Sequence, residues 1–394
     1  MKNSERNRLL LDSNLRIIFM VTLMAVMGVA SITPVFPKIT QELGVPAHSI
    51  GLLIITFTLP GVFLTPILGV LADRFGRKRV LVPSLFLFGI AGGLCSLTRD
   101  FTVLLVLRFF QGVGAAALGS INITLIGDIF QGNQRAAAMG YNASVLSIAV
   151  ASYPFFGGLL ATAGWNYPFL LPLLAVPIAI VVLLKLRNPE PKQKQLLGPY
   201  LKSAINSFKT RRAILYFTTS MIVFIILYGS YLTYTPIILA RNFSAKPFQI
   251  GLVLSVMSVV TALVSLQAGW LARRYGENCL LIASFPFYAA SLLLVPFAPS
   301  ILKVAAALLL FGVGQGINMP ALQTLLTGLA PIEYRAAFMS MNGMVLRIGQ
   351  TLGPLIMGGV YVISGINSTF FAGALLAMAM FFVLLPVIGK QKAR

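Results

Sequence analysis

One eight-residue segment occurs twice in this chain, and its second copy follows the first by 200 residues. The copies share five of eight residues and read Gly69-Val70-Leu71-Ala72-Asp73-Arg74-Phe75-Gly76 and Gly269-Trp270-Leu271-Ala272-Arg273-Arg274-Tyr275-Gly276. The same offset relates other residues: Gly112 and Gly312, Arg135 and Arg335, Asn142 and Asn342, Pro154 and Pro354. Because a shared hydrophobic bias would not align these residue types, the sequence predicts two repeated halves.

The composition indicates a lipid environment. The chain of 394 residues is 58% hydrophobic and 10% charged, whereas soluble domains are roughly 45–50% apolar and about 25% charged. Twelve segments are apolar over the roughly 20 residues that a membrane-spanning helix needs. They cover 17–37, 50–71, 80–98, 102–125, 137–160, 166–186, 213–236, 248–271, 279–297, 302–325, 337–360 and 366–388. We predict an all-α membrane protein with twelve transmembrane helices, and no cleavable signal before the first.

The distribution of basic residues sets the predicted orientation. With twelve spans, both chain ends lie on one side, which holds 23 of the 30 Lys and Arg residues, and the other side holds 5. Arg108 and Arg347 fall inside spans. Positive charge marks the cytoplasmic side, so both termini are expected in the cytoplasm and the protein in the plasma (inner) membrane. The net charge of +21 then reflects topology and attraction to anionic membrane lipid, not nucleic-acid binding.

The longest predicted loop, 187–212, separates a half at 1–186 from a half at 213–394. It begins with Asn188-Pro189-Glu190-Pro191, which cannot continue a helix. Apolar residues then recur at helical spacing beside Lys and Arg residues. This pattern predicts a short amphipathic helix on the cytoplasmic membrane surface.

The first repeated segment, with Arg77 and Lys78 after it, resembles the signature loop of the major facilitator superfamily. The resemblance implies two pseudo-symmetric halves of six helices and transport by alternating access. It also implies that Arg77 pairs with Asp128, and that Asp73 caps span eleven while the cytoplasmic side is closed. The expected gating residues are Gly69, Asp73, Arg74, Gly76, Arg77, Asp128 and Arg135. The alternative interpretation is a basic loop that only anchors the topology.

Span four reads Arg108-x-x-Gln111-Gly112-x-Gly114, which resembles a motif of the drug/proton antiporter branch. In that branch the arginine is linked to proton coupling, so Arg108 and Asp128 are the coupling candidates. The branch's glycine-rich motif in span five is only partly present, because Ala149 and Tyr153 replace two expected glycines. The alternative for Arg108 is a structural role in which it bonds backbone carbonyls or extends outward.

No carboxylate is expected in the middle of a span. Two basic residues, Arg108 and Arg347, are expected inside spans. Two cations without core anions predict a positive cavity, which favours an anionic, zwitterionic or neutral substrate over a cationic drug. Alternatively, Arg347 bonds carbonyls or faces outside the bundle. The family's cavity is lined by spans one, four, seven and ten. The expected cavity residues are Met24, Arg108, Asn122, Phe224, Tyr228, Tyr231, Gln315, Asn318 and Arg347, although the aromatic and methionine stripes also suit plain helix packing.

The predicted function is secondary active export of an amphipathic small molecule, driven by proton antiport. The alternative is an exporter or facilitator of an anionic, zwitterionic or lipid-like substrate without ion coupling, and a third class is a non-transporting membrane sensor. No nucleotide-binding loop or catalytic constellation occurs, so we expect no enzyme activity and no cofactor. Cys95 and Cys279 are expected to be small apolar residues rather than metal ligands. We expect a monomer.

Overall fold

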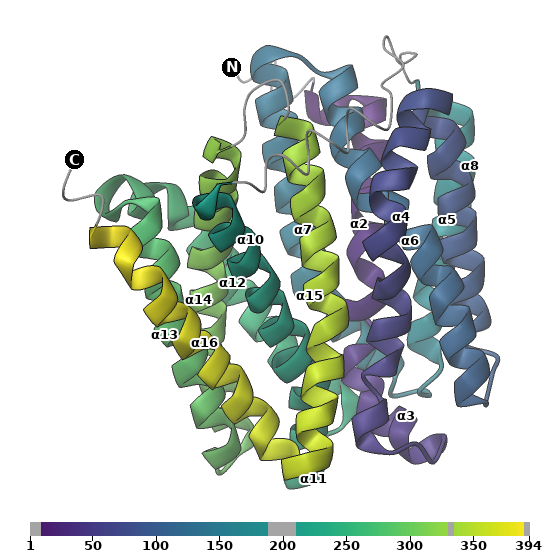
Figure 1. Ribbon diagram of the computed structural model, residues 1–394. Coiled ribbons are helices and arrows are strands. Elements are labelled where there is room, and N and C mark those ends of the chain that lie inside the picture. The colour runs from purple at the N-terminus through teal and green to yellow at the C-terminus, as the bar shows by residue number, and fades with distance from the viewer. Residues whose placement is uncertain (1–8, 188–209, 330–334, 390–394) are drawn as a thin grey trace.

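The computed structural model describes residues 9–187, 210–329 and 335–389, and these ranges form helices without any strand (Figure 1). The first group of helices is α2 (Ser13–Ala30), η1 (Thr33–Val35), α3 (Phe36–Glu42), η2 (Ala47–Ser49), α4 (Leu52–Phe75), α5 (Arg77–Leu94), α6 (Phe101–Ile129), α7 (Gly132–Leu160), η3 (Tyr167–Leu174) and α8 (Ala175–Lys185). The second group is α10 (Arg211–Ile225), η4 (Ile226–Tyr234), α11 (Thr235–Phe243), α12 (Pro247–Tyr275), α13 (Glu277–Leu294), η5 (Val295–Phe297), α14 (Ile301–Leu329), α15 (Arg335–Ser364) and α16 (Ile366–Gly389).

Eleven helical segments of the described chain are long and apolar enough to cross a membrane. The third predicted span corresponds to α5, an 18-residue helix that begins with Arg77, Lys78 and Arg79 and is not among the eleven. Several helices extend beyond the predicted apolar cores; α6 continues to Ile129 and α14 to Leu329. Backbone hydrogen bonding can continue past the hydrocarbon core, so hydropathy underestimates helix length. The predicted amphipathic linker helix falls on 188–209, which lies outside the described residues.

Local sequence signals explain several helix ends. The Asp12 carboxylate accepts a hydrogen bond from the Leu15 backbone N–H at 3.0 Å, and Asp100 accepts one from Val103 at 2.9 Å. These side chains satisfy amides that have no partner in the first turns of α2 and α6. At the repeated segments, Gly76 has φ +101° and Gly276 has φ +79°. This backbone conformation favours glycine, and it turns α4 into α5 and α12 into α13.

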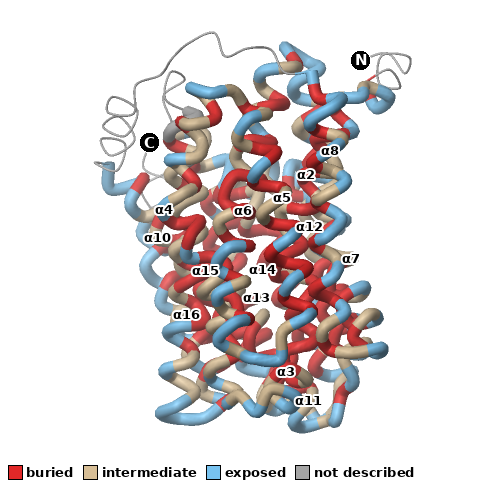
Figure 2. Tube along the Cα trace, turned by 90° about the vertical axis from the view of Figure 1, so that its right-hand side faces the viewer, coloured by how far each residue is buried: buried red, intermediate tan, exposed pale blue. Residues whose placement is uncertain are grey.

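The two groups of helices lie side by side and contact each other chiefly through α4 with α15 and α7 with α12. In Figure 1, α2 begins and α16 ends at the top, which we call the terminal end. The short helices α3 and α11 lie at the opposite end, which we call the far end. Figure 2 shows buried segments along the inside of the bundle and exposed ones on its outer faces. Large apolar residues that are exposed include Phe63, Leu184, Leu266 and Ile363, as expected for a protein in lipid.

Contacts between the two groups concentrate toward the far end. A Cβ atom at Gly51 would come within 2.9 Å of Pro354, and one at Gly251 would collide with the Pro154 carbonyl oxygen. Toward the terminal end, Gly69 and Gly269 have nothing within 4 Å of that position. The same two repeat-related helices, α4 and α12, are therefore tightly packed at one end and open at the other.

Candidate functional site

An ion-pair cluster around a buried arginine lies where α4 meets α5, at the terminal end. Arg77 is 7% exposed, and its Nε lies 3.0 Å from Asp128 Oδ2 on α6. Its Nη1 also bonds Asp73 Oδ1. The pair of Arg77 and Asp128 is the one that the resemblance implied, whereas the described partner of Asp73 is Arg77 rather than the start of α15. These contacts tie α4, α5 and α6 together, and their gating role stays a prediction.

Two further residues of the predicted gate lie near this cluster. Arg135, exposed in the first turn of α7, has Nη2 within 3.1 Å of the Cβ position of Gly127, one residue before Asp128. The Arg74 guanidinium lies 5.5 Å from the centroid of the Phe75 ring. Arg135 on α7 thus lies close to the end of α6 that carries Asp128.

The second copy of the loop keeps the turn but not these charges. Arg273 replaces the first-half Asp73, Glu277 replaces Arg77, and Gly328 replaces Asp128. The only ion pairs among the described residues are the two made by Arg77. In the described chain, ion pairs at the terminal end thus occur in the first group of helices and not in the second.

Arg108 lies inside the first group of helices, and its side chain is fully buried. Its Nε donates to the Leu53 carbonyl at 3.2 Å, and its Nη1 donates to Gln111 Oε1 at 2.6 Å. The guanidinium carbon lies 4.3 Å from the Phe57 ring centroid, and Nη2 has no described partner. The structure therefore places Arg108 between α4 and α6, where it bonds a backbone carbonyl as in the alternative interpretation. Its role in a substrate cavity stays a prediction.

Arg347 lies where the two groups of helices meet. It is half-buried on α15, and its Nε and Cδ lie 3.2 Å from the Cβ position of Gly61 on α4. Nη1 donates to Gln350 Oε1 at 3.3 Å. One turn away, the Thr351 and Thr58 hydroxyl oxygens lie 2.8 Å apart. Arg347 thus faces the other half. This position differs from both alternatives, in which Arg347 bonds backbone carbonyls or lies on the outside of the bundle.

Several predicted cavity residues turn toward neighbours in their own half. Gln315 Oε1 accepts from the Tyr288 hydroxyl at 2.5 Å, and Asn318 Nδ2 donates to Ser284 Oγ at 2.7 Å. Asn122 Nδ2 donates to the Ile18 carbonyl at 3.0 Å. These contacts link α14 to α13 and α6 to α2. A place of these residues in a substrate cavity stays a prediction.

The aromatic stripe predicted in span seven divides at a π-helical segment, η4. Phe224 and Tyr228 stack with ring centroids 5.7 Å apart. Tyr231 stacks on Phe311 instead, at 5.0 Å, and its hydroxyl donates to the Leu254 carbonyl at 3.3 Å. The π-helical turn changes the face on which Tyr231 lies. Met24 is buried at 3% exposure within the apolar core.

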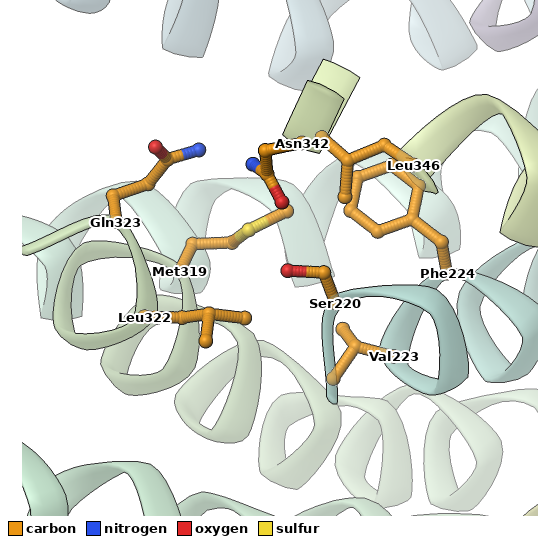
Figure 3. A pocket seen from close by; sticks show the side chains of 8 residues that line it. All are labelled: Ser220, Val223, Phe224, Met319, Leu322, Gln323, Asn342 and Leu346. Atoms are coloured by element: carbon orange, nitrogen blue, oxygen red, sulfur yellow. The ribbon is translucent and has the colours of Figure 1, made fainter. Parts of the chain in front are cut away.

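A small closed space, without room for a water molecule, lies in the second group of helices between α10, α14 and α15 (Figure 3). Of the predicted cavity residues, Phe224 lines it. Sequence reasoning did not assign Ser220, Met319 or Asn342 to a site, although Asn342 was visible as the repeat partner of Asn142. The complete lining is Ser220, Val223, Phe224, Met319, Leu322, Gln323, Asn342 and Leu346.

Gln323 also lines a second, open groove on α14, with Thr324, Thr327 and Gly328. This groove has a volume of about 350 Å³ and extends toward the terminal end, where α14 finishes at Leu329. No cluster of three or more potential metal ligands occurs in the part of the chain that is described. Of the two adjoining spaces, only the groove has room for a small molecule.

Comparison with known proteins gives a consistent family and fold. A family model described as Major Facilitator Superfamily matches residues 18–244 and 233–394. Multidrug resistance protein 1 of Bacillus subtilis (strain 168) is 26% identical over 362 residues, which cover 90% of this chain and 92% of the relative. Tetracycline resistance protein, class C, from Escherichia coli is 27% identical over 377 residues, 93% of this chain and 94% of the relative.

Solved structures resemble the whole chain in fold. A bacterial homologue of the human lysosomal transporter Spinster, in an inward-facing and unoccupied conformation, has a TM-score of 0.79 and 17% identity, with 98% of each chain covered. A human organic anion transporter has a TM-score of 0.70 and 17% identity, over 98% of this chain and all of that one. At such identities the likeness concerns the fold.

Proposed function

Because the chain belongs to the Major Facilitator Superfamily, we propose that it exports an amphipathic small molecule from the cytoplasm by proton antiport and alternating access. The main support for this proposal is that the two groups of helices are packed tightly toward the far end and open toward the terminal end. Alternating access needs a conformation that closes one side of the membrane while the other stays accessible. The resistance proteins named above support efflux as the direction.

In this proposal α5 also crosses the membrane, which raises the number of spans from eleven to twelve. It packs along α6 and against α8, as a helix inside a six-helix half does. Its first turn carries Arg77, Lys78 and Arg79, which suits a position at the cytoplasmic headgroups. An even number of spans puts both termini on the same side of the membrane, which in this proposal is the cytoplasmic side of the inner membrane. The protein is a monomer in this proposal, and residues 187–212 join halves at 1–186 and 213–394. The terminal end is then the cytoplasmic end.

Proton coupling in this proposal uses Asp128 with Arg77. The Asp128 side chain is one-third exposed, so a proton can reach it from the terminal end. Protonation removes the charge that attracts Arg77, and thereby loosens the contact between α5 and α6. Arg108 acts on this step indirectly, since its donors hold α4 against α6 through Leu53 and Gln111.

A second candidate function is uncoupled passage of an anionic, zwitterionic or lipid-like substrate. Arg347 favours it, because this cation lies between α15 and α4 with no described acidic partner. A cation at the boundary of the two halves attracts an anion that passes between them. The charge of the transported substrate distinguishes this candidate from export of a neutral or cationic amphiphile.

Flux measured in proteoliposomes tests the proposal. Purified protein is reconstituted, and uptake of a fluorescent amphipathic dye is followed with and without an imposed pH gradient. Antiport predicts that the gradient accelerates flux several-fold and that Asp128→Asn abolishes the acceleration. Glu277→Gln, which removes a carboxylate from the second copy of the loop at the position that corresponds to Arg77, serves as the control. If the gradient changes nothing in the unsubstituted protein, flux is uncoupled and the second candidate stands.

A further inference from the structure

In the second half, a direct hydrogen bond joins α10 to α13 near the start of both helices. The Tyr216 hydroxyl on α10 donates to Asn278 Oδ1 on α13 at 2.7 Å. Tyr216 is 3% exposed and Asn278 is 9% exposed. A buried contact between two neutral side chains therefore closes the seam between these helices at the terminal end.

The first half has two cations at the equivalent positions. At the offset of 200, Arg16 on α2 corresponds to Tyr216, and Lys78 on α5 corresponds to Asn278. Two side chains that carry only donors cannot bond each other, and their charges repel. Arg16 is exposed, and its Nε donates to the Leu10 carbonyl at 3.2 Å, which leaves its two Nη groups for another acceptor. The direct bond of the second half therefore has no counterpart here.

The end of α8 brings two more cations to the same place. Lys78 Nζ donates to the Leu186 carbonyl at 3.5 Å, and Leu186 lies between Lys185 and Arg187 in the chain. The Arg187 backbone N–H donates to Asn14 Oδ1 at the start of α2, at 3.0 Å. α8 also packs along both α5 and α2. Cations carried by α2, by α5 and by the end of α8 therefore meet at the terminal end.

This basic cluster, which consists of Arg16, Lys78, Lys185 and Arg187, has no acidic partner in the described chain. The ion pairs found there are those of Arg77. A carboxylate one turn before Arg16, that of Asp12, accepts from the Leu15 backbone N–H at 3.0 Å. Its charge is therefore engaged in capping α2, and the cluster stays strongly positive.

The repeat does not explain the last two cations of the basic cluster. Leu385 and Val387 occupy the places of Lys185 and Arg187 in the second half. The residue before Lys185, Leu184, is 74% exposed. The first half thus combines a concentration of positive charge with an exposed apolar surface directly beside it.

We propose that the basic cluster binds the phosphate headgroup of an anionic phospholipid, which bridges Arg16 and Lys78 while its acyl chains lie along α8 beside Leu184. Phosphate oxygens accept hydrogen bonds from both cations at once, and basic sites between membrane helices bind anionic headgroups. An inorganic phosphate offers the same oxygens but has no chain to cover Leu184. The site goes beyond the proposed export function and does not depend on it.

Native mass spectrometry of the purified protein, titrated with phosphatidylglycerol or phosphatidylcholine of the same acyl chains, tests the site. The unsubstituted protein should bind phosphatidylglycerol more tightly. Arg16→Gln combined with Lys78→Gln should weaken this binding about tenfold or more, because each basic residue near an anionic headgroup contributes roughly fivefold. Binding of phosphatidylcholine should change less than about twofold. As a matched control, Arg273→Gln with Arg274→Gln removes the same charge from exposed residues of α12 and should leave both affinities unchanged.

A second double variant, Arg16→Tyr with Lys78→Asn, copies the neutral pair of the second half. It should lose phosphatidylglycerol binding as the glutamine variant does, and its unfolding temperature without lipid should match or exceed that of the unsubstituted protein. Equal affinity of the unsubstituted protein for the two lipids, full affinity in either double variant, or an equal loss in the Arg273 and Arg274 control overturns the site. Displacement of the lipid by excess inorganic phosphate would show a free-anion site and also overturn it.

Discussion

The hydroxyl groups of Thr58 on α4 and Thr351 on α15 share a hydrogen bond, with their oxygens 2.8 Å apart. They lie 293 positions apart in the chain, and both are buried. The bond joins the first group of helices to the second at a depth between Gly51 and Gly61 of α4. The bond can therefore form only while the two halves are in contact toward the far end.

Loss of this bond should favour opening of the far end. Thr351→Val keeps the shape and removes the hydroxyl, at a cost of about 1 kcal/mol, or about fivefold in the equilibrium between closed and open. Distances between spin labels on α3 and α11, measured by pulsed electron resonance, should show the greater open population. Thr56→Val is the control, because Thr56 bonds Leu52 within α4. An unchanged distance distribution would mean that the bond does not hold the halves together.

Added volume at the other contact between the halves should have a similar effect. The Cβ of Gly251→Ala on α12 would collide with the Pro154 carbonyl oxygen on α7, and overpacking of this kind costs typically 1–3 kcal/mol. We expect a larger open fraction at the far end and slower export. Gly269→Ala, on the same helix with open space around it, should behave as the unsubstituted protein; the same spin-label distances compare the two.

Removal of Arg77 should affect function more than removal of its repeat partner. Arg77→Ala leaves Asp73 and Asp128 side by side without their shared cation, so the two carboxylates repel each other. We expect export to fall at least tenfold, measured as dye flux in proteoliposomes. Glu277→Ala should reduce it less than twofold. Adding Asp128→Asn to Arg77→Ala should restore part of the flux measured without a pH gradient, and a further loss of that flux would argue against a charge-pair role.

Arg108 should prove to be a residue on which the fold of the first half depends. Arg108→Lys cannot both bond the Leu53 carbonyl and Gln111 and lie flat on Phe57. We expect a loss of roughly 2–3 kcal/mol in unfolding free energy, visible as a lower midpoint in thermal or denaturant unfolding. A lysine variant with the original midpoint but without pH-driven flux would instead show that Arg108 acts directly in coupling.

Much of the architecture is readable from local patterns in the chain. Eleven of the segments expected from hydropathy are helices long enough to span a membrane, because an isolated helix must be apolar along its length to be stable in lipid. The turn at Gly76 and Gly276 is visible in the repeat, since a backbone with positive φ favours glycine. The pairing of Arg77 with Asp128 followed from a resemblance, and the structure contains that contact.

The direction in which each polar side chain points is a property of the packed helices. Hydropathy shows that Arg108, Gln315 and Asn318 lie within spans, but it cannot show which neighbouring helix they face. The π-helical segment η4 turns Tyr231 away from Phe224 and Tyr228, and no periodicity rule anticipates it. Asn142 and Asn342 occupy equivalent places in the repeat, yet Thr22 donates to the Asn142 oxygen while the Asn342 oxygen has no partner among the described residues. Whether a buried polar group is structural or free to bind depends on the residues opposite it, and these come from distant parts of the chain.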